Sequence, residues 1–157
     1  MKKLTIISIV TILLDQIIKY LIITNLRFTE SINIIRNFFR ITYLQNEGAA
    51  WSILSGNRIP LIIITLLALM FIFVLIKKKE KFLKIEYVFY GTLIGGIIGN
   101  LIDRIRYGFV IDYLDFNFGG YNYPVFNFAD MCIVISTIVL IIISIKEDKN
   151  GNKSRKK

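Results

Sequence analysis

Long apolar runs separated by short charged ones dominate the pattern of this sequence. The apolar segments cover about residues 4–23, 59–76, 85–105 and 128–145. At about 1.5 Å per helical residue, each can cross a hydrocarbon core of roughly 30 Å, with some tilt or local thinning of the bilayer. The pattern predicts an α-helical integral membrane protein with four transmembrane helices in one membrane-embedded domain, residues 1–145.

Basic clusters flank these segments and predict their orientation. The clusters are Lys2 and Lys3, residues 77–84, and the polar tail 146–157. Because Lys and Arg mark the cytoplasmic side, we expect a multi-pass protein with both termini in the cytoplasm. The connections at about 24–58 and 106–127 then lie outside. The tail is polar and charged, and we expect it to be disordered.

The first apolar segment has the basic start of a secretory signal peptide. However, Asp15 and Lys19 interrupt it, and no A-x-A-like cleavage site follows. The pattern favours a retained membrane anchor.

Composition narrows the classes of function. The 157 residues are 55% hydrophobic and carry a net charge of +9. In a soluble protein that charge would suggest nucleic acid, but no nucleic-acid-binding motif is visible. The chain has no histidine, which excludes Ser-His-Asp and Cys-His catalysis and His-ligated metals. The single cysteine, Cys132, excludes a disulfide within the chain.

Several charged residues interrupt the predicted spans, where a charge costs at least about 2.5–3.5 kcal/mol. Asp15 and Lys19 stand at i and i+4, on one helix face about 6 Å apart along the axis. They could neutralise each other inside the bundle, and Asp15 could also bind substrate. Asn100, Asp103 and Arg104 also share a helix face. The spacing leaves open a hydrogen-bond network or an interfacial ion pair.

Two aspartates could carry chemistry at the outer face. Asp130 begins the fourth span and could simply be a helix N-cap, while Asp112 lies among apolar residues in the second outer connection. If they met, repulsion would leave one proton shared between them, as in aspartic proteases. The spacing alone does not establish that they meet. We interpret Asp115 as a solvated loop carboxylate.

Five motifs in order resemble those of lipoprotein signal peptidase (signal peptidase II), a family of bacterial membrane aspartic proteases. They are "DQIIK" (Asp15–Lys19), "NEGAAWS" (Asn46–Ser52), "GNLIDR" (Gly99–Arg104), "VIDY" (Val110–Tyr113) and "FNFAD" (Phe126–Asp130). The family often has Phe where this chain has Tyr113, and Ser where it has Met131. The resemblance covers nearly the whole chain and the four-span layout.

The resemblance implies the following expectations. Asp112 and Asp130 form the catalytic pair, and the outer connections form a small β-cradle and a short outer helix. The substrate is a diacylglyceryl-modified prolipoprotein in the bacterial cell membrane, cut just before the lipidated cysteine. Residues that bind substrate or support the site are Asp15, Lys19, Asn46, Gly48, Asn100, Asp103, Arg104, Asn127 and Ala129. We expect no cofactor, no metal and no nucleic acid, contacts with membrane lipids, and a monomer.

Three other functions compete with this one. A Ser-Lys protease would need an activated serine near Lys19, but Ser8 is 11 residues earlier on the same helix. A small transporter could use Asp15, Lys19 and Asp103 as a proton relay. A membrane scaffold would use its polar residues only for packing.

Overall fold

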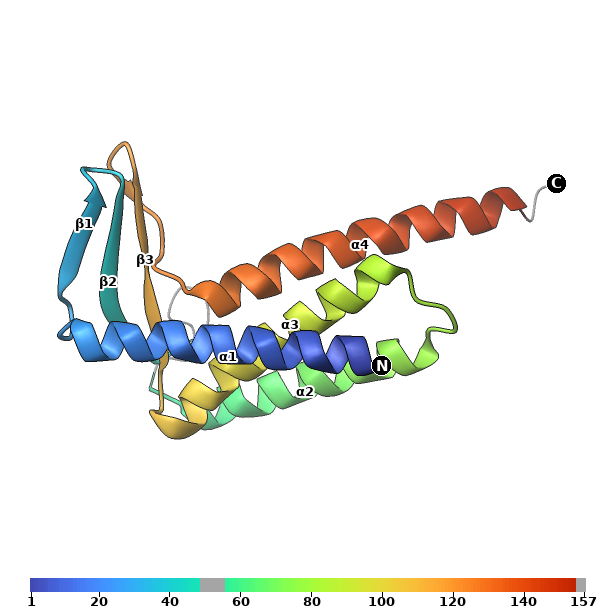
Figure 1. Cartoon of the computed structure of the whole chain (residues 1–157), viewed down its shortest axis with the longest axis horizontal. Helices are drawn as coiled ribbons and strands as arrows, with labels where there is room; N and C mark the ends of the chain where they lie inside the picture. Colours follow the sequence, from blue (N-terminus) through green and yellow to red (C-terminus); the bar gives the residue numbers. More distant parts are fainter. Residues whose placement is uncertain (49–55, 155–157) are drawn as a thin grey trace.

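The computed structural model describes residues 1–48 and 56–154, which form helices and an antiparallel sheet (Figure 1). The helices are α1 (Lys2–Asn25), α2 (Arg58–Lys78), α3 (Lys84–Arg106) and α4 (Phe128–Ser154). The strands are β1 (Ser31–Ile35), β2 (Phe39–Asn46), β3 (Val110–Phe118) and β4 (Tyr121–Asn122). The N-terminus and the connection between α2 and α3 lie at one end of the helices, and the sheet lies at the other (Figure 1).

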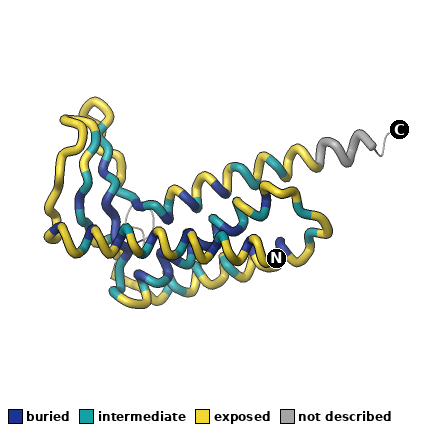
Figure 2. Tube along the Cα trace, viewed as in Figure 1, coloured by how far each residue is buried: buried dark blue, intermediate teal, exposed yellow. Residues whose placement is uncertain are grey.

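All four helices are long and apolar enough to cross a membrane, which confirms the four predicted spans. Many of their large apolar side chains are exposed, such as Leu13 of α1 and Phe71 of α2 (Figure 2). In water this exposure would be costly, but against lipid tails it is the expected outer surface of a bundle.

Helix α3 occupies the centre of the bundle, with α1 and α4 packed against it. Glycines allow both contacts. A Cβ atom at Gly95 would lie 2.6 Å from Thr11 Cβ, and one at Gly96 would lie 2.7 Å from the carbonyl oxygen of Ala129. These small residues of α3 therefore serve close helix packing.

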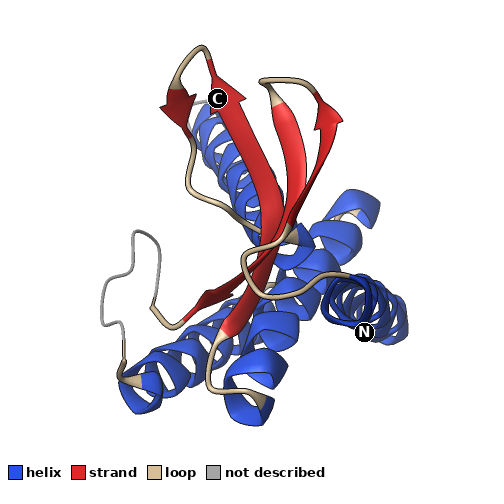
Figure 3. Cartoon of the chain, turned by 90° about the vertical axis from the view of Figure 1, so that its left-hand side faces the viewer, coloured by secondary structure: helices blue, strands red, loops and turns tan. Residues whose placement is uncertain are grey.

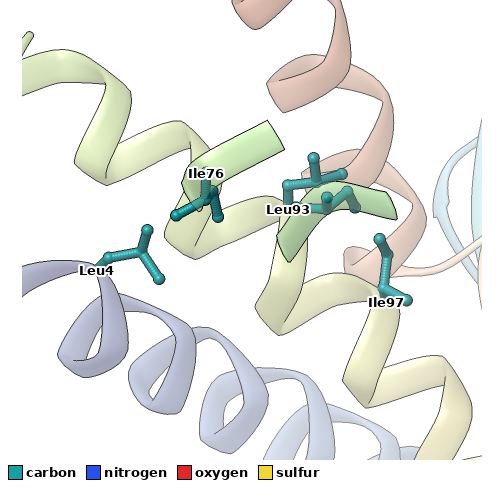
Figure 4. Close-up of a cluster of buried hydrophobic side chains, with 5 residues drawn as sticks. Leu4, Ile76, Leu93 and Ile97 are labelled. Atoms are coloured by element: carbon teal, nitrogen blue, oxygen red, sulfur yellow. The ribbon is translucent and has the colours of Figure 1, made fainter. Parts of the chain in front are cut away.

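An apolar cluster joins α1, α2 and α3 (Figure 4). Its buried members are Leu4, Ile72, Ile76, Leu93 and Ile97. Because these residues come from three helices, the cluster fixes α2 against α1 and α3. The closest contacts between α1 and α3 are made by small side chains.

The sheet has the strand order β1-β2-β3-β4 and is antiparallel throughout. Its strands extend past α1, α2 and α3 when the helices are viewed end-on (Figure 3). A second apolar cluster attaches the sheet to the end of α1 through Ile22 and the C-cap residue Leu26, which pack with Ile111 and Tyr113. This packing holds β3, the strand that carries Asp112, at the end of the bundle.

Helix α4 continues from the fourth span into the polar tail. The tail is helical through Ser154, so the expected disorder is wrong for residues 146–154. Glu147 contacts the Lys79 ammonium at 2.7 Å, which ties this end of α4 to the α2–α3 connection.

The expected short outer helix is not found in the described parts of the connections at the sheet end. Residues 49–55, which include part of the "NEGAAWS" motif, lie outside the described residues.

Candidate active site

The Asp112 carboxylate projects from β3 and is almost completely buried, with 3% exposure. One oxygen accepts a hydrogen bond from Asn46 Nδ2 of β2 at 2.8 Å, and the other accepts from Asn127 Nδ2 at 2.7 Å. Burial, reinforced by the nearby negative charge of Asp130, raises the pKa of Asp112 to about 7. This carboxyl group can therefore retain a proton near neutral pH.

The second carboxylate, Asp130, lies in the first turn of α4. It is not the N-cap, because that position belongs to Asn127. Asn127 Oδ1 accepts from the Asp130 backbone N–H at 2.9 Å, and Asp130 Oδ2 accepts from the Asn127 N–H at 3.3 Å. This reciprocal pair is a capping box. Asn127 thus contacts both aspartates, so the structure brings Asp112 and Asp130 together.

A third asparagine connects Asp130 to the centre of the bundle. Asn100 of α3 donates from Nδ2 to Asp130 Oδ1 at 2.7 Å and accepts from the Lys19 ammonium at 2.8 Å. Because a lysine ammonium can only donate, it fixes which end of the Asn100 amide faces Asp130.

The same arrangement recurs at all three asparagines. In each, the side-chain oxygen accepts from a fixed donor: Gly48 N for Asn46, Lys19 Nζ for Asn100, and Asp130 N for Asn127. Each amide therefore turns its NH₂ group toward a carboxylate of the pair. The site presents fixed hydrogen-bond donors to both aspartates.

Lys19 lies at the centre of a buried ionic cluster. Its ammonium is 2.9 Å from Asp15 Oδ2 and 2.8 Å from Asp103 Oδ2, with the lysine 1% exposed and both aspartates 0% exposed. The predicted Asp15–Lys19 pair is present, but it also reaches α3. Asp103 belongs to this buried network, rather than to an interfacial ion pair. Its Oδ2 atom accepts from the Ile111 N–H at 3.2 Å, which links α3 directly to β3.

Gln16 is a member of this network that the sequence interpretation missed. Its side-chain amide donates to Asp103 Oδ1 at 3.0 Å and reaches Asp15 Oδ2 and the Gly99 carbonyl oxygen at 3.3 Å each. A polar residue inside an apolar span was the available signal.

The remaining predicted residues surround the pair. Arg104 donates from Nη2 to the Gly48 carbonyl oxygen at 3.1 Å, and its buried Nε has no partner among the described residues. Ala129 is completely buried, and its carbonyl oxygen lies against Gly96 of α3. Arg104 therefore keeps donor capacity at the site, whereas Ala129 contributes close packing of α4.

Tyr113, Asp115 and Ser8 have contacts that the sequence interpretation did not predict. The Tyr113 hydroxyl, which the sequence interpretation left without a role, accepts from the Phe128 N–H at the start of α4 at 3.1 Å. Asp115 is buried and paired with Arg40, so its interpretation as a solvated carboxylate is wrong. Ser8 Oγ donates to the Gly91 carbonyl oxygen at 2.9 Å, while Lys19 is held by the carboxylates, so these two do not form a Ser-Lys pair.

Comparisons with known proteins place this geometry in context. The family model described as signal peptidase (SPase) II matches residues 7–146. A lipoprotein signal peptidase of Halothermothrix orenii is 42% identical over 147 residues, covering 94% of this chain and 98% of that protein. One of Clostridium acetobutylicum is 40% identical over 146 residues, covering 92% and 95%. A solved bacterial membrane enzyme superposes with a TM-score of 0.86 at 35% identity, covering 96% and 92%.

Proposed function

Because the chain belongs to the signal peptidase II family, the bacterial membrane proteases that remove signal peptides from prolipoproteins, we propose that Asp112 and Asp130 are its catalytic pair. The observation that carries this proposal is the position of Asn127. It donates to Asp112 at 2.7 Å and forms the capping box with Asp130, so one residue holds both carboxylates in a fixed relation. The pair sits where β3 meets the first turn of α4.

The pair would act by sharing one proton. The ionised carboxylate takes a proton from a water molecule as that oxygen attacks the scissile carbonyl carbon. The protonated carboxyl donates to the carbonyl oxygen, giving a neutral tetrahedral diol. Proton return to the leaving amide nitrogen then breaks the C–N bond and releases an amine and a carboxylic acid. Proton transfers between the pair, water and the peptide balance without another reagent.

The surrounding residues have distinct roles in this proposal. Asn46 and Asn100 orient the two carboxylates. The cluster of Asp15, Lys19 and Asp103 fixes Asn100 and the end of α3. Arg104 offers N–H groups that have no partner among the described residues to a carbonyl oxygen of the substrate, since a guanidinium has five donors in a rigid fork.

The orientation proposed from the basic clusters agrees with the arrangement of the elements. The N-terminus and the lysine-rich α2–α3 connection share one end, and the sheet and the start of α4 lie at the other (Figure 1). The aspartate pair belongs to this second end, because Asp112 is in β3 and Asp130 is in the first turn of α4. We place the first end in the cytoplasm and the pair near the outer face. There, water can reach the pair while the signal peptide stays in the membrane. The chain would act as a monomer.

The proposed substrate is a prolipoprotein whose cysteine carries diacylglycerol, cut just before that cysteine. Purified enzyme should shorten this substrate on a gel, and mass spectrometry of the product should find the lipidated cysteine at its N-terminus. The same polypeptide without the lipid should be cut poorly, because the acyl chains hold the scissile bond at the membrane surface. Equal cleavage of both forms would contradict the proposed requirement for lipid.

The pH dependence of cleavage should report the shared proton. A pair with one proton needs Asp112 protonated when Asp130 is ionised, and the pKa of Asp112 is about 7. As pH rises through this value the shared proton is lost, so kcat/KM should fall on the alkaline side of about 7. The fall belongs to the pair rather than to one residue.

Asn46→Leu should shift the alkaline limb of the pH–rate profile, which is the fall in kcat/KM above about pH 7, in a predictable direction. The Asn46 amide donates to the Asp112 carboxylate and thereby lowers the pKa of Asp112. Its removal should raise that pKa and move the alkaline limb to higher pH, in addition to lowering the maximal rate. A pH–rate profile of both enzymes on the lipidated substrate measures the shift. A limb that stays in place or moves to lower pH would argue against Asp112 as the titrating group.

A further inference from the structure

Lys79 joins the ends of three helices, well away from the aspartate pair. It lies directly after α2, and its ammonium contacts Glu86 in the first turn of α3 and Glu147 of α4, the latter at 2.7 Å. Helix α4 runs from the sheet end toward the α2–α3 connection, so these contacts are made at the end opposite the sheet (Figure 1). We call these three residues the Lys79 cluster. The proposed catalytic chemistry uses none of them.

The two carboxylates of the Lys79 cluster differ in exposure. The Glu86 side chain is 2% exposed, and its second oxygen accepts from the Leu83 N–H at 2.8 Å, so both of its oxygens are engaged within the protein. The Glu147 side chain is 43% exposed. An ion pair at the surface contributes little to stability, because water solvates both charges. Another cation can therefore replace Lys79 at Glu147 while Lys79 stays on Glu86.

The rest of this end is strongly basic. Its exposed lysines are Lys2, Lys3, Lys77, Lys78, Lys81, Lys84 and Lys146. Such a surface repels a basic ligand, except where an accessible carboxylate offsets the charge. Of the side chains that the structure describes, the exposed carboxylates at this end belong to Glu80 and Glu147. Of these two, Glu147 is on α4, the helix that begins at the candidate active site and leads to this end.

The proposed substrate carries the complementary charge. A signal peptide begins with a positively charged n-region, continues with an apolar h-region of about 7–15 residues and ends at the cleavage site. With its scissile bond at the aspartate pair, its h-region crosses the membrane and its n-region reaches the opposite end of the enzyme. At about 1.5 Å per residue, α4 rises about 25 Å from Asp130 to Glu147. A helical signal peptide with a long h-region covers the same distance, which places its n-region level with Glu147.

We propose that Glu147 binds the basic n-region of the signal peptide, with a lysine or arginine of the substrate replacing the Lys79 ammonium. This inference rests on the proposed substrate and orientation, and it adds a specificity-determining residue at the membrane surface opposite the reacting bond. Lys79 keeps its contact with Glu86, so no buried charge loses its partner in the exchange. Because the contact is the same in the bound substrate and in the transition state, it lowers KM and leaves kcat unchanged.

Two forms of one substrate test this assignment. The first is a diacylglyceryl-modified prolipoprotein with two lysines in its n-region, and the second has both lysines replaced by glutamine. The enzymes are the full-length wild type, Glu147→Gln and the control Glu80→Gln, which removes an exposed carboxylate from the same end. Initial rates on gels, in an uncharged detergent, give kcat and KM for each combination. The ionic strength is kept low, because salt screens exposed charges.

We expect the wild type to have a several-fold lower KM for the lysine form than for the glutamine form, with equal kcat. Glu147→Gln should lose this preference, and Glu80→Gln should keep it. Glu147→Lys should reverse it and favour an n-region with two glutamates. The proposal is overturned if Glu147→Gln keeps the preference, if Glu80→Gln loses it as well, or if the wild type has none. A wild type that cuts neither form would refute the proposed function, and this inference with it, so the two failures are distinguishable.

Discussion

Replacing either Asp112 or Asp130 with asparagine is expected to abolish cleavage of lipidated prolipoprotein, with a loss of at least about 100-fold in kcat. Asparagine keeps the shape of the side chain but can neither take a proton from water nor donate one as an acid. Because the two carboxyls would act as a unit, either single change should cost about as much as both together. Initial rates on gels, at saturating substrate, measure the loss.

The chain offers a matched control on the same strand. Asp115 is also buried in β3, but it pairs with Arg40 on the opposite face of the sheet from Asp112. Asp115→Asn should therefore retain cleavage within a few-fold, even if the sheet is somewhat less stable. Thermal unfolding in detergent would establish that all three variants fold. Normal cleavage by a folded Asp112 or Asp130 variant would sink the catalytic assignment.

The four spans could be predicted because bilayer thickness sets the length of an apolar run, whatever the tertiary contacts. The structure agrees with each predicted span and extends several of them by a few residues. The tail was less predictable, since its helix is continuous with a span and its Glu147 meets Lys79 from a distant part of the sequence. Composition alone does not report such a contact.

Local sequence patterns could predict only part of the candidate active site. Helical spacing identified Asp15 and Lys19, but the partner Asp103 comes from α3 and depends on how closely glycines let α1 approach. The burial of Asp115 likewise depends on strand register, which shifts between Ile41 and Leu44 of β2. Spacing could not have supplied that register.

The role of Asp130 shows how one residue can satisfy two interpretations. The sequence suggested a helix cap or a catalytic carboxylate as alternatives. In the structure the cap is Asn127, and Asp130 is its partner in the capping box. Because the box uses the oxygen of the Asn127 side chain, the NH₂ group is left to face Asp112. The local helix signal thus contributes to the geometry of the site.

Lys19→Met is expected to destabilise the protein by about 3–5 kcal/mol, because it leaves buried carboxylates without their counter-charge. The Lys19 ammonium lies 2.9 Å from Asp15, 2.8 Å from Asp103 and 2.8 Å from Asn100 Oδ1. Methionine preserves the length and apolar body of the side chain, so the loss is mainly electrostatic. Thermal unfolding of the purified protein in detergent, with the wild type alongside, measures the change.

The same variant also tests whether Lys19 orients the pair. Without the ammonium, the Asn100 amide can rotate and present its oxygen to Asp130, which would repel the ionised carboxylate. Cleavage at a temperature where the variant is still folded should therefore fall, mainly in kcat, since Lys19 lies in the bundle and away from the substrate. Lys3→Met, an exposed change on the same helix, should leave both stability and cleavage near wild type. If Lys19→Met loses stability but keeps full kcat when folded, Lys19 only compensates buried charge. The proposal that Lys19 orients the Asn100 amide toward Asp130 would then be wrong.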